Sequence, residues 1–96
     1  MNTICEATSG HQGACAELAT RADVMVVIGG RISANTTRLA EISRGLCPAT
    51  HHIEGADELL PEWFEGAELI GITAGASTPA SQIEAVRDAI QEMLGA

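Results

Sequence analysis

The 96-residue chain contains no lysine and no tyrosine, and its aromatic residues are limited to Trp63 and Phe64. Five arginines stand against thirteen acidic residues, which gives a formal net charge of −8. This balance argues against nucleic-acid binding, because a phosphate backbone is bound by a surplus of basic side chains. A chain that is 46% hydrophobic with so few aromatics must build its core from Ala, Val, Ile and Leu. Buried parallel strands have this composition.

Several motifs are also missing. Neither GxGxxG nor GxxxxGK[ST] occurs, so dinucleotide and P-loop binding are unsupported, and a serine hydrolase would lack its nucleophile elbow. The longest apolar run, Val24 to Ile28, is too short to cross a bilayer, and the N-terminus does not resemble a signal peptide. Three cysteines without a CxxC pair favour a reducing, cytoplasmic setting over a disulfide scaffold.

Strand and helix patterns alternate along the chain without repeats or linkers. Strands are expected at residues 2–5, 24–28, 49–54 and 69–73. Apolar residues at helical spacing predict helices around residues 15–22, from about Asn35 onward, and from Thr78 onward, with a short helical segment at 55–66 broken by Pro61. This order predicts a single three-layer α/β/α domain over residues 1–96, with a mainly parallel sheet of about four strands.

Capping residues mark the expected helix ends. Asn35 is a good N-cap for the second helix, and Gly45 is its natural C-terminal glycine. Thr78 as N-cap followed by Pro79 in the first turn is a favoured start for the last helix.

Polar residues are concentrated in three strand-to-helix loops, at residues 5–8, 29–35 and 73–79. In a parallel sheet these loops open at one edge, where thin loops and helix N-termini can receive an anion. Side-chain donors come from Ser33, Asn35, Ser77 and Thr78. The pattern is consistent with a phosphate or diphosphate site, although each residue could also be an ordinary cap or loop residue.

Cys5 lies at a strand end facing the same edge, a position that raises a reactive or ligating role for it beside the usual role of a lone cysteine as a small buried hydrophobe. Cys15, in a helix stripe, and Cys47 are expected to be small buried hydrophobes.

His51 and His52 are adjacent on a strand and point to opposite faces, so a shared metal is disfavoured. We further expect His11 at a pocket rim or in solvent, a surface pair of Glu84 with Arg87, and a solvated acidic face formed by Glu54, Asp57, Glu58, Glu62 and Glu65.

Taken together, the motifs resemble a known family. Residues 2–8 (NTICEAT), 27–39 (VIGGRISANTTRL) and 71–79 (GITAGASTP) are similar to three signatures of the LytB family, in the same order and with little change of spacing. Residues 52–54 (HIE), with the Asp-Glu and Trp-Phe pairs that follow, also resemble that family. The resemblance covers nearly all of the chain.

The resemblance implies an iron–sulfur reductase of the non-mevalonate isoprenoid pathway, which converts 4-hydroxy-3-methylbut-2-enyl diphosphate to isopentenyl and dimethylallyl diphosphates. Three similar α/β domains surround a 4Fe-4S cluster in this family, and each provides one cysteine. By this resemblance Cys5 is the cluster ligand of the last domain, and Ser33, Asn35 and Ser77 bind the diphosphate. The implied partners are two further domains, the allylic diphosphate, and a ferredoxin or flavodoxin-type electron donor.

The chain departs from the family pattern at several positions. Ala34 stands where a second serine is usual, Arg31-Ile32 replaces a Lys-Asn pair, Ala80 takes a common aspartate position, and His11 stands where arginine is frequent. The two preceding domains, with their cysteines, histidines and proton-relay glutamate, do not occur in this sequence. We therefore expect this chain alone to be inactive as a reductase.

Two other hypotheses remain open from the sequence. The first is a non-enzymatic module that binds a phosphorylated metabolite at the same sheet edge. The second is a structural or oligomerising domain whose exposed sheet edges or apolar faces associate.

Overall fold

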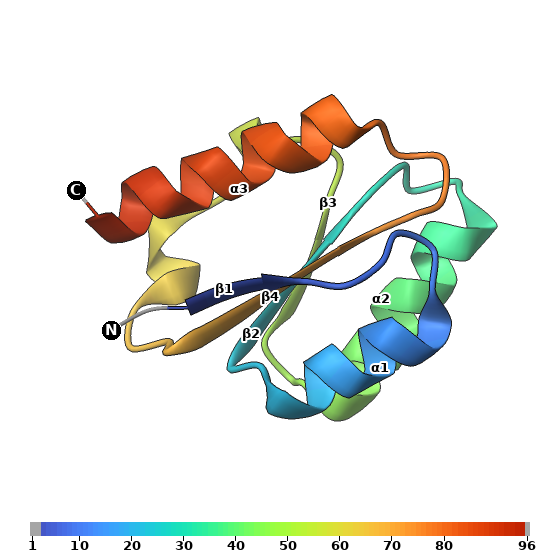
Figure 1. The fold of residues 1–96 in the computed structure, drawn as a ribbon, viewed down its shortest axis with the longest axis horizontal. Helices are drawn as coiled ribbons and strands as arrows, with labels where there is room; N and C mark the ends of the chain where they lie inside the picture. Colours follow the sequence, from blue (N-terminus) through green and yellow to red (C-terminus); the bar gives the residue numbers. More distant parts are fainter. Residues whose placement is uncertain (1–2, 96) are drawn as a thin grey trace.

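The computed structural model describes residues 3–95 as one four-stranded, all-parallel sheet between two helical layers (Figure 1). This confirms the predicted α/β/α architecture. In chain order the elements are β1 (Thr3–Glu6), α1 (Gln12–Arg21), β2 (Val24–Ile28), α2 (Ala34–Leu46), β3 (Thr50–Ile53), the 3₁₀ turns η1 (Ala56–Glu58) and η2 (Pro61–Phe64), β4 (Leu69–Ala74) and α3 (Ala80–Gly95). Over the described range, no helix is long and apolar enough to cross a membrane.

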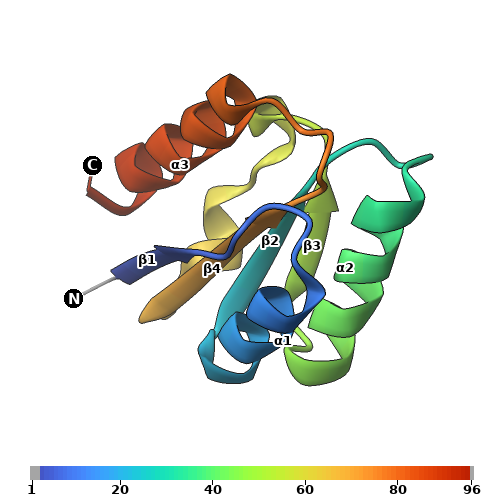
Figure 2. The same ribbon diagram turned by 45° about the vertical axis from the view of Figure 1, so that its right-hand side comes forward.

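The strand order is β1-β4-β2-β3, so the last strand of the chain lies between the first two. Helices α1 and α2 cover one face of the sheet, and α3 with the two 3₁₀ turns covers the other (Figures 1 and 2). Because all strands are parallel, their carboxyl ends point to the same edge, at the right of Figure 1.

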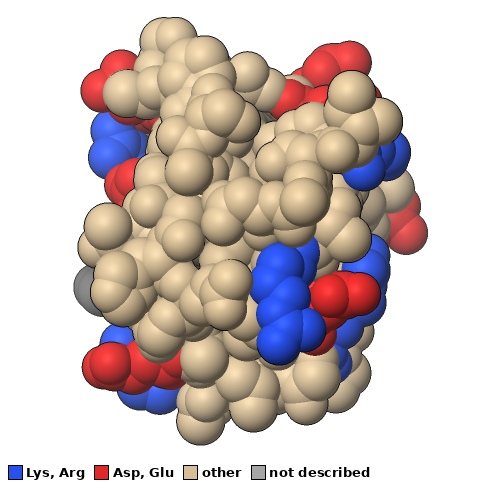
Figure 3. All heavy atoms as spheres, turned by 90° about the vertical axis from the view of Figure 1, so that its right-hand side faces the viewer, with Lys and Arg blue, Asp and Glu red and all other residues tan. Residues whose placement is uncertain are grey.

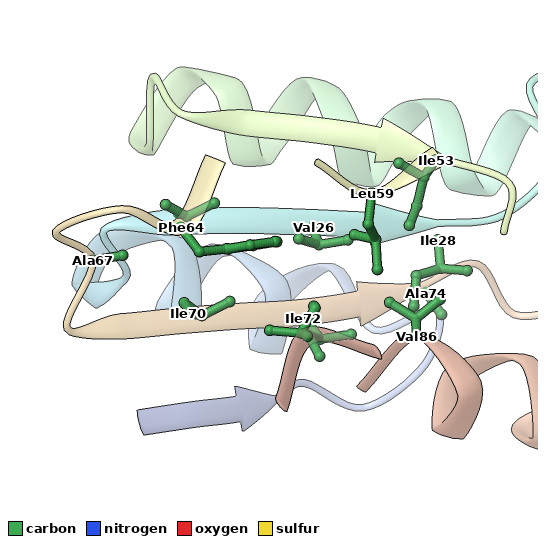
Figure 4. Packing of buried hydrophobic residues seen from close by; sticks show 12 residues of the cluster. Val26, Ile28, Ile53, Leu59, Phe64, Ala67, Ile70, Ile72, Ala74 and Val86 are labelled. Atoms are coloured by element: carbon green, nitrogen blue, oxygen red, sulfur yellow. The ribbon is translucent and has the colours of Figure 1, made fainter. Parts of the chain in front are cut away.

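β2 lies inside the sheet, and all five of its residues are buried. Alternate side chains belong to the two opposite cores, which explains why the strand is apolar throughout. Toward α3, the core shown in Figure 4 includes Val26, Ile28, Ile53, Leu59, Phe64, Ala67, Ile70, Ile72, Ala74 and Val86. Toward α1 and α2, the core contains Cys15, Leu18, Ala19, Met25, Val27, Leu39, Ala40 and Cys47.

Gly71 on β4 makes room for the core between the sheet and α1. A Cβ at this position would overlap the Met25 sulfur and would come within 2.9 Å of the Leu18 side chain. The glycine therefore allows α1 to pack close to the strand.

The structure corrects several predicted helix ends. α2 is capped by Ser33, and Asn35 lies inside its first turn; Gly45 also lies within α2, which ends at a Cys47 cap. Thr78 does not cap α3, which begins at Ala80. The Thr78 hydroxyl instead donates to the Ile28 carbonyl at 3.2 Å, so a neighbouring strand end takes the group that local spacing assigned to the helix. The strand predicted from Asn2 is seen from Thr3 onward, and Asn2 lies outside the described residues.

Candidate functional site

The loops that follow β1, β4 and β2 meet at the carboxyl edge, because these three strands are neighbours in the sheet. Gly10 N–H donates to the Ala74 carbonyl at 2.8 Å, which joins the first loop to the end of β4. Gly75 N–H donates to the Ile28 carbonyl at 3.0 Å, which joins the β4–α3 loop to the end of β2. The polar loops that are remote in sequence are therefore in direct contact (Figure 2).

Ser33 lies at the start of α2 on this edge. Its Oγ accepts a hydrogen bond from Thr36 N–H at 3.3 Å, and the residue is half-buried. The hydroxyl keeps its own hydrogen as a donor while it caps the helix. Ser33 can thus stabilise α2 and still donate to a bound anion.

Asn35 joins α2 to the β4–α3 loop. Its Oδ1 accepts a hydrogen bond from Ala76 N–H at 2.8 Å, across 41 residues of sequence. Because this bond uses the amide oxygen, the Nδ2 group is left as the side-chain donor. The contact also brings the exposed Ser77, one residue after Ala76, to the start of α2.

A buried threonine that the sequence did not single out lies between the two loops. Thr36 is fully buried on α2, and its Oγ1 has no hydrogen-bond partner within residues 3–95. A Cβ added at Gly29 or at Gly75 would overlap this hydroxyl. Gly29 also has a positive φ of 151°, which disfavours other residues there. The two glycines therefore allow both loops to close around Thr36.

Arg31 in the β2–α2 loop pairs with two acidic residues. Its guanidinium lies 2.7 Å from Glu58 Oε1 and 3.6 Å from Glu54 Oε1. Glu54 is exposed, as expected for a solvated face, and Glu58 is half-buried. Both also connect the β3 end to the neighbouring loop through Arg31.

Cys5 is half-buried near the carboxyl end of β1, and it lines a cavity of about 200 Å³. The cavity is lined by Cys5, Glu6, Ala7, Thr8, Ala14, Glu17, Leu18 and Arg21. None of Ser33, Asn35 or Ser77 lines it. The structure thus places the three anion-site candidates in touching loops and gives Cys5 a separate opening beside α1.

Glu6 forms the ion pair with Arg87 of α3 at 2.8 Å, whereas the predicted partner Glu84 interacts with Arg87 only through a smaller charge effect. The Glu6 carboxylate, as hydrogen-bond acceptor and as charge, raises the pKa of the Arg87 guanidinium above its ordinary value. This ion pair ties β1 to the α3 layer.

The remaining cysteines have structural contacts. Both Cys15 and Cys47 are buried, as predicted. Cys15 Sγ lies 3.1 Å from Ser43 Oγ, and Cys47 Sγ donates to the Ala22 carbonyl at 3.5 Å. These contacts join α1 to α2.

The histidines do not converge on a metal site. His51 stacks on Trp63 with ring centroids 3.9 Å apart, whereas His52 Nε2 lies 3.0 Å from the Gly29 carbonyl. His11 caps α1, with Nδ1 accepting from Ala14 N–H at 2.9 Å. No group of three or more His, Cys, Asp or Glu residues suited to a metal ion occurs in the part of the chain that the structure describes.

The surface at the carboxyl edge is less charged than the net charge of −8 would suggest. Figure 3 shows this side of the molecule as mostly uncharged, with its few charged side chains in mixed basic and acidic clusters. The carboxylates on this side are therefore interspersed with basic side chains rather than gathered into a purely acidic patch.

The family model described as "LytB protein" matches residues 1–91 of this chain. The chain belongs to the LytB family. This confirms the family that the sequence motifs indicated.

Curated members of the LytB family are similar over almost the whole chain. The 4-hydroxy-3-methylbut-2-enyl diphosphate reductase of Aquifex aeolicus (strain VF5) is 55% identical over 93 residues, which cover 97% of this chain and 32% of the relative. The enzyme of the same name from Geobacter sulfurreducens is 54% identical over 91 residues, covering 95% and 32%. The chain thus spans about a third of the length of the curated relatives it matches.

Two solved structures agree with the fold. A structure described as (E)-4-hydroxy-3-methyl-but-2-enyl diphosphate reductase, the terminal enzyme of the non-mevalonate pathway, superposes with a TM-score of 0.83 at 54% identity, covering 84% of this chain and 29% of that one. The Plasmodium falciparum E-1-hydroxy-2-methyl-but-2-enyl-4-diphosphate reductase has a TM-score of 0.75 at 22% identity, covering 83% and 25%, and supports the fold alone.

Proposed function

We propose that this chain forms the last domain of a 4-hydroxy-3-methylbut-2-enyl diphosphate reductase, and that its carboxyl edge holds part of the substrate's diphosphate. The names of the relatives support the activity, and the share of their length that the chain spans supports a contribution by one domain. The structural observation that carries the diphosphate role is the Asn35–Ala76 hydrogen bond, because it brings the Ser77 loop against the start of α2.

In this proposal the diphosphate is held by neutral donors. The hydroxyls of Ser33 and Ser77 and the Asn35 Nδ2 group donate to phosphate oxygens, and the N-terminal end of α2 adds partial positive charge. Neutral donors suit a chain with net charge −8, whose overall field would otherwise repel the substrate. Ala34 contributes no hydroxyl, so the site has one fewer donor than the usual family pattern.

Cys5 would provide one thiolate to a 4Fe-4S cluster. The structure fits a single ligand: the half-buried thiol is free and opens onto a cavity, and residues 3–95 contain no larger grouping of ligand side chains. The remaining ligands would then come from the two other domains. When bound, the cluster supplies the electrons that remove the allylic hydroxyl. A ferredoxin or flavodoxin-type donor in a reducing, cytoplasmic setting would complete the system.

The activity is tested by joining this chain to the preceding two-thirds of the Aquifex aeolicus relative. The reduction of 4-hydroxy-3-methylbut-2-enyl diphosphate by this chimera is then measured anaerobically. We expect turnover that Cys5→Ala abolishes and that Ser77→Ala lowers mainly through a raised KM. Cys15→Ala is the matched control, since that buried thiol contacts only protein groups, namely the Leu39 carbonyl and Ser43 Oγ. A folded chimera whose turnover does not depend on Cys5 would contradict the cluster assignment.

Two measurements on the isolated chain test the cluster role and the anion-binding role separately. After anaerobic addition of iron and sulfide, we expect no stoichiometric cluster, because two ligand-bearing domains are missing. Titration with inorganic diphosphate should give weak binding that Ser77→Ala reduces and Cys5→Ala leaves unchanged. This result would hold for either function, whereas turnover of the chimera would separate them.

A further inference from the structure

Arg31 fastens the β2–α2 loop to the end of β3. Its guanidinium Nη2 lies 2.7 Å from Glu58 Oε1 and donates to the His52 carbonyl at 3.4 Å, and its backbone N–H donates to Glu54 Oε2 at 3.1 Å. Both the side chain and the backbone of Arg31 therefore contact the next strand and its following turn.

The acidic partners are themselves held in place. Glu58 Oε2 accepts a hydrogen bond from Glu54 N–H at 2.9 Å, which links η1 to the end of β3. The Glu54 carbonyl accepts from the Gln82 side chain of α3. The Glu58 carboxylate is thus attached to the end of β3, and the Glu54 backbone to η1 and α3, so the partners of Arg31 form a firmer anchor than two isolated surface side chains.

The segment fastened by Arg31 is the turn that presents Ser33. Ser33 N–H donates to the Gly30 carbonyl at 3.1 Å and closes a turn over residues 30–33, and Ser33 Oγ then caps α2. Arg31 lies inside this turn. Its contacts with the two carboxylates therefore limit where the Ser33 hydroxyl can lie.

The charge of the cluster argues against a direct contact of Arg31 with substrate. One guanidinium faces two carboxylates, so the cluster of Arg31, Glu54 and Glu58 carries a formal charge of about −1. A cluster with that charge does not attract a diphosphate. Any contribution of Arg31 to diphosphate binding must therefore come through the position of the turn that carries Ser33.

We infer that Arg31 is a positioning residue for the diphosphate site, and that it acts through Glu54 and Glu58 to hold the Ser33 turn. This inference rests on the proposed function. An arginine suits this role because a guanidinium can engage two carboxylates and a carbonyl together, whereas an ammonium is a single point charge.

The inference is tested by NMR titration of the ¹⁵N-labelled 96-residue chain with inorganic diphosphate, following the Ser33 and Ala76 amides. We expect Arg31→Ala to weaken binding about fivefold and Arg31→Lys to restore part of the loss. The double variant Glu54→Gln/Glu58→Gln should weaken binding to a similar extent, although it removes two negative charges. Glu62→Gln/Glu65→Gln is the control for charge, since it makes the same charge change on exposed residues of η2 and its C-cap.

The double variant of the two glutamates decides whether Arg31 acts through its carboxylate partners. If Glu54→Gln/Glu58→Gln binds diphosphate as well as or better than the parent chain, Arg31 does not act through its carboxylates and the inference is overturned. Amide hydrogen exchange at Ser33, measured without ligand, should be several-fold faster in Arg31→Ala. If the parent chain binds no diphosphate, the proposed function fails separately, and unchanged exchange at Ser33 would then also refute the positioning role.

Discussion

The Asn35 side-chain oxygen accepts a hydrogen bond from the Ala76 backbone N–H at 2.8 Å, and this one contact determines which way the amide points. An amide has one acceptor end and one donor end, so a backbone donor on Oδ1 directs Nδ2 to other partners. The side chain is thereby fixed in the orientation that suits an anion. The contact both links two loops and prepares a donor.

Asn35→Asp should separate these two roles. The carboxylate can still accept from Ala76 N–H, and a negative charge in the first turn of α2 is favourable, so the unfolding free energy should be unchanged or slightly higher. The Nδ2 donor is lost and a like charge is introduced, so inorganic diphosphate should bind about tenfold more weakly or worse. Calorimetric titration and urea unfolding measure the two effects.

Thr37→Asp is the matched control, because it adds the same charge to an exposed position in the same turn. We expect it to weaken diphosphate binding much less than Asn35→Asp does. Equal losses in the two variants would show that charge alone, rather than the lost amide donor, explains the effect.

Gly75→Ala should destabilise the fold by about 1–3 kcal/mol, because its new Cβ would overlap the buried Thr36 hydroxyl. Adding Thr36→Ala to this variant should restore part of the lost stability. Gly45→Ala provides the contrast: it lies in α2 with no atom within 4 Å of the added Cβ, so it should stabilise by about 0.5–1 kcal/mol. Urea denaturation of the four chains tests the overlap, and a neutral Gly75→Ala would contradict it.

His51 should make stability depend on pH in the mildly acidic range. Burial, and then the charge of Arg44, lower the pKa of His51 below its ordinary value of 6.5. The folded state therefore binds the proton less readily than the unfolded state. The contribution of His51 to the free energy of unfolding is fully present above the ordinary pKa of histidine. It is lost as the pH falls below that value toward the lowered pKa of the folded state.

His51→Phe should keep the stack on Trp63 and remove this dependence. Urea midpoints at pH 7.5 and pH 5 should differ less for the variant than for the parent. The same pH difference in both chains would assign it to other groups, and an NMR titration of His51 gives its pKa directly.

Asp23 should contribute stability in a separate, more acidic range. Its Oδ2 accepts from Leu69 N–H and Glu68 N–H, both at 2.9 Å, and these bonds lower its pKa below 3.8. The stability is present above that value and is lost as the pH falls through the lowered folded pKa. Asp23→Asn should therefore flatten the acid limb of an unfolding curve followed by circular dichroism, while Asp57→Asn, on the exposed 3₁₀ turn, should not.

Much of the site could be located before the fold was known. The polar residues in the loops at 29–35 and 73–79 lie at one edge because parallel strands impose it. The separation of His51 from His52 also followed from strand geometry, and the structure gives them different partners. The errors concerned Asn35 and Thr78, which local spacing assigned to helix caps while distant backbone groups compete for their side chains.

The sequence by itself determined the α/β/α layering, the parallel strands and the family, since a five-residue apolar run such as Val24–Ile28 must be buried on both faces. Only the tertiary structure decided the strand order β1-β4-β2-β3 and hence which loops touch. It also decided the orientation of the Asn35 amide and the pairing of Arg31 with Glu54 and Glu58. These contacts join residues more than twenty positions apart, so no local periodicity encodes them, and they form only when packing brings the partners together.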